Sequence, residues 1–96
     1  MPSKILKIEK VEFSKPFQKL FAKLPSKKQQ KAKDAINLLE ADPSARKLRL
    51  HELQGELAGV YSISAGGDLR LHLEFIIEGN VARFVAVGTH SQLYGG

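Results

Sequence analysis

Two histidines of this chain, His51 and His90, carry the side chain best suited to moving protons near neutral pH. The ordinary pKa of imidazole is about 6.5, so one ring can accept a proton while another donates one. His90 belongs to the closing segment GTHSQLYGG, residues 88–96, and His51 lies far upstream in KLRLHELQG, residues 47–55. We therefore predict that the fold brings these histidines together as an acid and base pair.

Basic side chains near the histidines indicate an anionic substrate. Arg70 and Arg83 lie in the apolar stretches between the two segments. A guanidinium suits both a phosphodiester and the added charge of a phosphorane-like transition state. Lys47 and Arg49 precede the first histidine, and we expect them to contact flanking phosphates.

Three of the candidate side chains also have simpler structural explanations. Arg70 could form a surface ion pair with Glu74 or Asp68, which stabilises a fold little when it is exposed. Asp68 follows two glycines and is by default a turn residue, because its carboxylate bonds to nearby backbone. Tyr94 could stack on an unpaired base, as aromatic side chains do in RNA recognition, or pack down the C-terminal tail. The residues alone leave these alternatives open.

Composition sets the class of protein. The 96 residues, 43% hydrophobic and 26% charged, predict one ordinary globular domain over residues 1–96. No apolar run approaches the ~18 residues that span a bilayer, and no secretory signal is visible, so we expect a cytoplasmic protein without a membrane partner. Without cysteine, and with three histidines, no disulfide, metal site or cofactor is expected. The formal charge of +5 favours a polyanion or an acidic protein segment as partner.

The first half of the chain predicts a strand and two helices. Residues 5–13 alternate as a strand with a bend at its centre. Apolar spacing predicts a helix that begins at Ser14 and ends at Pro25. A second helix is expected with Ser26 as its N-cap and Pro43 at its end, so that the two helices pack as an antiparallel pair.

The second half predicts β structure. Residues 45–54 are expected to form a loop or irregular strand, and three strands follow at about 57–64, 69–77 and 81–87, separated by glycine turns. The order is strand, helix, helix, strand, strand, strand. This order predicts an α+β fold in which two N-terminal helices pack on a small antiparallel sheet.

Alternation along the second of these three strands decides which side chains share a face of the sheet. Its leucines lie on the core side, so Arg70 and His72 lie on the other. A three-residue turn at residues 66–68 pairs Ile63 with Leu71 and keeps the two faces unmixed.

The turn between the last two strands places another arginine. A two-residue turn at Gly79–Asn80 pairs Phe84 with Phe75 and puts Arg83 on the face of Arg70. We therefore predict one polar face that carries the candidate site, with the helices on the opposite face.

Two segments of the sequence resemble the RelE/ParE superfamily of bacterial and archaeal toxins, and within it the YafQ-type branch. That branch has a His-x-Leu-Gln-Gly segment and a closing Gly-Thr-His-x-x-Leu-Phe-Gly, matched here by residues 51–55 and 88–95. The resemblance covers the whole chain in element order and is specific over residues 51–95. It implies a compact fold of two helices on a small antiparallel sheet.

The resemblance also implies an mRNA interferase that enters the ribosomal A site, against ribosomal RNA, and cleaves the codon there. The 2′-hydroxyl of the substrate attacks the adjacent phosphate, leaving a cyclic phosphate and a 5′-hydroxyl, without a metal. By position, His51 and His90 are the acid and base, Asp68 supports the site electrostatically, and Tyr94 holds the codon. Arg70 matches the transition-state arginine of other RelE-like branches. We take His51 as the base and His90 as the acid, although the sequence does not separate them.

Besides Tyr94, which stands where the YafQ-type branch usually has phenylalanine, the chain departs from that branch at two positions. Ser64 stands where the branch has a further histidine, and Leu69 stands where it has tryptophan. His72 lies two positions beyond Arg70 on the same predicted face. Our hypothesis is that His72 replaces the missing histidine and contacts the substrate.

Two other functions compete with RNA cleavage. ParE-like members poison DNA gyrase by protein contact and need no paired histidines, so retention of His51, His90 and Arg70 favours the nuclease. A degenerate copy that only binds its antitoxin is the third reading, motivated by Ser64 and Leu69. All three predict a cognate antitoxin whose acidic or amphipathic segment folds across the basic face.

Overall fold

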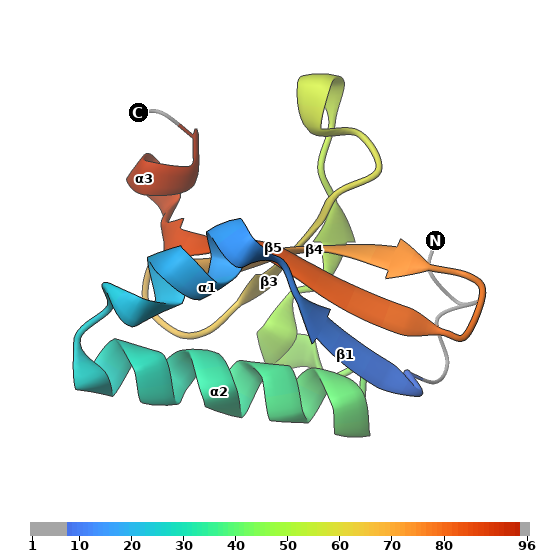
Figure 1. The fold of residues 1–96 in the computed structure, drawn as a ribbon, viewed down its shortest axis with the longest axis horizontal. Coiled ribbons are helices and arrows are strands. Elements are labelled where there is room, and N and C mark those ends of the chain that lie inside the picture. Colours follow the sequence, from blue (N-terminus) through green and yellow to red (C-terminus); the bar gives the residue numbers. More distant parts are fainter. Residues whose placement is uncertain (1–7, 95–96) are drawn as a thin grey trace.

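Helices and strands follow one another in the order expected from the sequence, with additional short elements (Figure 1). The computed structural model describes residues 8–94. Its elements are β1 (Lys10–Phe13), α1 (Lys15–Ala22), α2 (Ser26–Ala41), the 3₁₀ helix η2 (Arg46–Leu48), β2 (His51–Glu52), the 3₁₀ helix η3 (Gly55–Leu57), β3 (Tyr61–Ser64), β4 (Leu69–Ile76), β5 (Val81–Thr89) and α3 (His90–Tyr94).

The five strands form one mixed sheet in the order β1-β5-β4-β3-β2. Every neighbouring pair is antiparallel except β1 and β5, which run parallel. The prediction of an antiparallel sheet is therefore wrong for β1. Short turns force consecutive strands to be antiparallel, whereas β1 is separated from β5 by both helices and three strands, so no turn determines its direction.

The starts of the two long helices differ in how they are capped. Ser14 caps α1 as predicted, because its Oγ accepts a hydrogen bond from the backbone N–H of Phe17 at 3.1 Å. Ser26 is not the cap of α2. Pro25 occupies that position with extended backbone (φ −60°, ψ 155°), and Ser26 is already the first helical residue.

The core lies between the helices and one face of the sheet (Figure 1). Phe17 of α1 and Leu39 of α2 are buried against strand side chains that include Leu71, Leu73 and Phe84. Phe84 has no exposed surface, and its ring lies 5.8 Å from that of Phe17. The helices therefore cover one face, as predicted, and leave the opposite face of the sheet for other contacts.

The register of β3 and β4 agrees with the prediction. Ile63 pairs with Leu71, Ser64 pairs with Arg70, and the turn closes with a bond from the Ala65 N–H to the Leu69 carbonyl at 2.9 Å. Two parts of this region differ from expectation. The strand predicted from residue 57 begins at Tyr61, because η3 and the turn after it occupy the preceding residues, and β2 adds a short edge strand within the predicted irregular segment.

The turn between β4 and β5 is longer than predicted. Ile76 pairs with Val81, so four residues connect the strands, with Gly79 and Asn80 both at positive φ (85° and 53°). Phe84 consequently faces Leu73 and not Phe75, and a bulge between His72 and Leu73 shifts the register by one residue further along. A shift of two residues preserves the faces, so Arg83 stays on the predicted side.

Candidate functional site

A small pocket on the face opposite the helices collects four of the predicted site residues. Its cavity has a volume of about 220 Å³. The lining residues are Arg49, His51, Ser62, Ser64, Arg70 and His90. The two histidines, separated in sequence by most of the sheet, therefore share one pocket with two guanidinium groups.

Strand register explains how these side chains meet. His51 of β2 pairs with Ser62 of β3, and the next pair of β3 residues along the same face is Ser64 with Arg70 of β4. Arg70 in turn pairs with Gly88 of β5, two residues before His90. Directly paired residues point to the same face of a sheet, so two adjacent rows of this face, one with His51 and Ser62 and one with Ser64 and Arg70, bring the four strands' side chains to the pocket.

The ring of His51 has a defined orientation. Its Nδ1 lies 2.7 Å from the backbone carbonyl oxygen of Arg49. A carbonyl oxygen only accepts hydrogen bonds, so Nδ1 carries the proton and, in the neutral ring, Nε2 is left with its lone pair. Arg49 presents this carbonyl from a left-handed backbone conformation (φ 53°, ψ 42°). The exposed His51 is thus arranged to accept a proton at Nε2.

Arg70 is held by the turn between β3 and β4. Its Nη1 donates to the carbonyl oxygens of Gly67 at 3.0 Å and Leu69 at 3.1 Å, and to Ser64 Oγ at 3.4 Å. Among the residues that the structure describes, no ion pair joins Arg70 to Glu74 or Asp68. These bonds use only Nη1, so within the described residues 8–94 the remaining N–H groups of the guanidinium stay available to an anion in the pocket.

His90 is positioned by a reciprocal capping arrangement at the start of α3. The N–H of Thr89 donates to Gln92 Oε1 at 2.8 Å, and the N–H of Gln92 donates to Thr89 Oγ1 at 3.2 Å. The N–H of His90 itself donates to the carbonyl oxygen of Asp68 at 3.0 Å. The sequence analysis missed Thr89 and Gln92, although the pattern Thr-x-x-Gln is a known signature of a capping box.

The fold has well-matched relatives among solved structures. YafQ from E. coli strain BL21(DE3) superposes with a TM-score of 0.73 at 27% sequence identity, covering 88% of this chain and 97% of that one. YafQ in the E. coli DinJ–YafQ toxin–antitoxin complex gives 0.72 at 26% identity, covering 92% and 100%. The YoeB/ParE toxin from Agrobacterium tumefaciens shares the fold at 17% identity, with a TM-score of 0.71 over 84% and 98%. No protein-family model and no curated protein sequence matches the chain.

The chain is similar in fold and in sequence to toxins of the RelE/ParE superfamily, YafQ among them. Its likeness to YafQ agrees with the resemblance found in the sequence, and the toxins among its structural relatives support a toxin function. Within residues 8–94, no helix combines the length and the apolar composition needed to cross a membrane. The same residues contain no group of three or more histidine, aspartate or glutamate side chains placed to hold a metal ion.

His72 lies beside the pocket and does not line it. It is 5% exposed and pairs with Ser62 on one side and with Ala86 on the other. Burial lowers the pKa of His72 below its ordinary value, and the positive charge of nearby His51 lowers it further. The buried ring therefore favours the neutral state. A neutral, buried ring suits packing beneath the residues of the pocket better than direct contact with an anion.

The lowered pKa of His72 predicts that stability depends on pH. The unfolded chain binds this proton more readily than the folded protein does. The free energy of unfolding should therefore be highest above about pH 6.5 and should decrease as the pH drops below that value. Urea denaturation at about pH 7.5 and about pH 5.5 measures the difference. In His72→Gln the other two histidines remain, and the slope should be smaller. Equal slopes in the two proteins would contradict the buried, neutral state.

Lys47, Arg83 and Asp68 do not line the pocket. Lys47 lines a different cavity, which shares Ser64 with this one. Arg83 is exposed on the same face, but it pairs with Glu74, four residues from Arg70 along β4, or about 13 Å. Asp68 reaches the site through its carbonyl group, and its carboxylate lies on an exposed turn residue. The side chain of Tyr94 lies outside the described part of the chain, so its role stays a prediction.

Proposed function

We propose that residues 1–96 form one toxin domain that cleaves mRNA codons in the ribosomal A site. The observation that carries this proposal is the shared pocket of His51, Arg70 and His90. One histidine is oriented as a proton acceptor, and the guanidinium of Arg70, two strands away in the sheet, lines the same pocket. Such a set suits phosphodiester cleavage by an internal 2′-hydroxyl, which needs a base, an acid and a group that balances negative charge.

In the proposed reaction, His51 Nε2 takes the proton of the 2′-hydroxyl while the 2′-oxygen forms a bond to the adjacent phosphorus. The free N–H groups of Arg70 contact the phosphate oxygens as negative charge builds on them. The bond from phosphorus to the 5′-oxygen breaks, and His90 gives that oxygen a proton. The products are a 2′,3′-cyclic phosphate and a 5′-hydroxyl. The two histidines supply both proton transfers, so we propose a reaction that does not depend on a metal.

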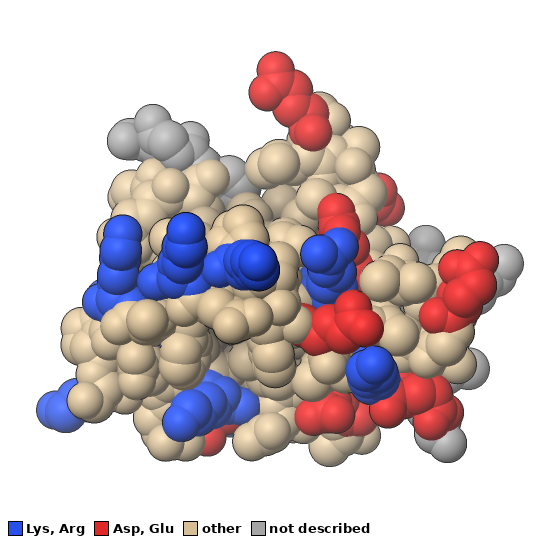
Figure 2. All heavy atoms as spheres, viewed as in Figure 1, with Lys and Arg blue, Asp and Glu red and all other residues tan. Residues whose placement is uncertain are grey.

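A cognate antitoxin is the proposed protein partner, and the toxin is expected to act in the cytoplasm. Solved relatives include the E. coli DinJ–YafQ complex and, at 21% identity, the RelE–RelB complex from Pyrococcus horikoshii. Figure 2 shows lysine and arginine side chains in a row over α1 and again over α2, whereas most of the acidic side chains in this view lie toward the strand ends, with some cationic side chains among them. An acidic segment of the antitoxin would be attracted to this basic surface and would neutralise it.

Primer extension on a reporter mRNA in a translation extract tests the proposed activity. The wild-type chain should produce cuts in phase with codons, and His90→Ala should produce none. Cleaved ends should carry a cyclic phosphate and a 5′-hydroxyl. Arrested growth without cuts from either protein would contradict the proposal and would favour gyrase as the target.

The capping arrangement of α3 should affect cleavage through His90. A Cβ on Gly88 would lie 2.9 Å from Gln92 Oε1, so Gly88→Ala should push Gln92 away from the Thr89 N–H. We expect about tenfold slower cleavage, with stability reduced by no more than about 1 kcal/mol. Gln92→Ala should slow cleavage to a similar extent, because it removes the same hydrogen bond to the Thr89 N–H.

Gln92→Glu is the matched control for this prediction. Glutamate keeps an acceptor at the same place in a capping box, so cleavage should stay close to that of the wild type. If Gln92→Ala and Gln92→Glu were equally impaired, the capping bonds would not be what positions His90.

A further inference from the structure

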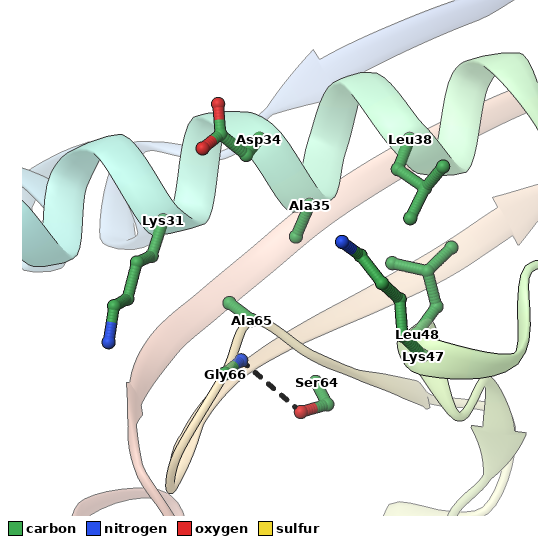
Figure 3. Close-up of a pocket in the computed structure, with 9 residues that line it drawn as sticks. All are labelled: Lys31, Asp34, Ala35, Leu38, Lys47, Leu48, Ser64, Ala65 and Gly66. Atoms are coloured by element: carbon green, nitrogen blue, oxygen red, sulfur yellow. Dashed lines mark hydrogen bonds between the residues drawn. The ribbon is translucent and has the colours of Figure 1, made fainter.

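A second cavity lies next to the catalytic pocket, between α2, η2 and the turn after β3. Its volume is about 430 Å³. Its lining residues are Lys31, Asp34, Ala35, Leu38, Lys47, Leu48, Ser64, Ala65 and Gly66 (Figure 3). Ser64 also lines the catalytic pocket, so the two cavities adjoin at this residue.

Cavity sizes limit what each one can hold. Pockets that hold small ligands measure about 300 to 1,000 Å³. The catalytic pocket, at about 220 Å³, is below that range and suits the scissile phosphodiester more than a whole nucleotide. The second cavity, at about 430 Å³, is within the range. An RNA strand cut in the first cavity must continue beyond it, and the second is the adjoining space.

The lining of the second cavity combines apolar and cationic groups. Ala35, Leu38 and Leu48 give it an apolar wall, while Lys31 and Lys47 enter from opposite sides, one from α2 and one from η2 (Figure 3). The apolar wall suits the face of a base, and the two ammonium groups suit the phosphate that follows it.

The one carboxylate of the lining does not oppose an anion in the cavity. The Asp34 carboxylate points away from both lysines (Figure 3) and accepts a hydrogen bond from Gln30 Nε2 at 2.9 Å. Ser64 Oγ, at the boundary, accepts bonds from Arg70 Nη1 and from the Gly66 N–H, both at 3.4 Å. The wall between the cavities is therefore tied to the arginine of the catalytic pocket.

We infer that the second cavity binds the nucleotide next to the scissile phosphate, with Lys31 and Lys47 on its phosphate. This inference rests on the proposed RNA cleavage and extends it to the substrate beyond the cut. It makes the two lysines substrate-binding residues that act on a neighbouring phosphate and leave the proton transfers unchanged.

The test measures A-site codon cleavage on ribosomes programmed with short synthetic mRNAs. Lys31→Ala/Lys47→Ala should slow cleavage at subsaturating toxin by about tenfold, two exposed contacts each changing an equilibrium by about threefold. The rate at saturating toxin should change little. Lys19→Ala/Lys33→Ala removes the same charge from helix positions outside this cavity and should cleave like the wild type.

A neutral methylphosphonate, placed in turn at each phosphate flanking the cut, shows what the lysines touch. At one position the methylphosphonate should slow cleavage by the wild type about tenfold, the same factor as the double substitution. It should not slow the double variant further, because the methylphosphonate and the lysine substitutions remove the same contact. Additive losses at every position would overturn the inference. Codon cleavage would then stand without the subsite, whereas a wild-type chain that cuts no mRNA would remove both proposals. A double variant that cuts normally but escapes its antitoxin would assign the cavity to the antitoxin instead.

Discussion

Replacing His51 by alanine should slow codon cleavage by about 100-fold to 10,000-fold, the usual contribution of a general base. The reason lies in the Arg49 carbonyl, which accepts the Nδ1 proton at 2.7 Å and so leaves Nε2 to take the proton of the attacking hydroxyl. His51 is exposed, so the substitution should leave the folded state intact. Single-turnover rates on programmed ribosomes, with circular dichroism to check folding, measure the effect.

An altered leaving group separates the two histidines. An mRNA with sulfur in place of the 5′-bridging oxygen leaves as a thiolate, which needs no proton from an acid. This substrate should restore cleavage by His90→Ala and should not restore cleavage by His51→Ala. The opposite pattern would exchange the two roles, and rescue of neither variant would contradict the acid role of His90. Arg46→Ala, an exposed η2 residue outside the pocket, should cleave normally with both substrates.

Local patterns were sufficient to predict most of the fold. Helical spacing and Ser14 located α1, and the turn at residues 66–68 gave the register of β3 and β4, because an odd turn was needed to keep Ile63 opposite Leu71. The direction of β1 was not predictable in this way. It depends on where the chain returns after the whole helical pair, and alternation within residues 10–13 is the same for parallel and antiparallel pairing.

The sequence predicted those site residues whose place follows from the face of the strand on which they lie. It failed for those whose place depends on the exact position along the strand. His51, Arg70 and His90 share the pocket as expected. The two-residue error in the β4–β5 turn kept Arg83 on the right face while misplacing it along the sheet. The capping role of Gln92 was missed because the last strand was expected to end before Thr89, which left no helix start to recognise.

Arg70→Ala should be the arginine substitution with the largest effect, slowing cleavage by about 100-fold to 1,000-fold. Three hydrogen bonds hold Nη1 before any substrate binds, so the guanidinium reaches the phosphate without reordering. Arg70→Lys should recover little, because an ammonium lacks the second arm that contacts the phosphate while the first is held by the turn. The rate at saturating toxin reports this loss.

Arg83→Ala is the matched control, because it removes one positive charge from the same face of the sheet. Arg83 pairs with Glu12 of β1 and Glu74 of β4, so two carboxylates flank it where a phosphate would have to bind. General attraction to RNA falls equally in both variants, and only Arg70→Ala loses a group in the pocket. Cleavage by Arg83→Ala should therefore stay within about twofold to threefold of the wild type. Equal losses in the two variants would show that Arg70 acts through net charge and not through its position beside His51.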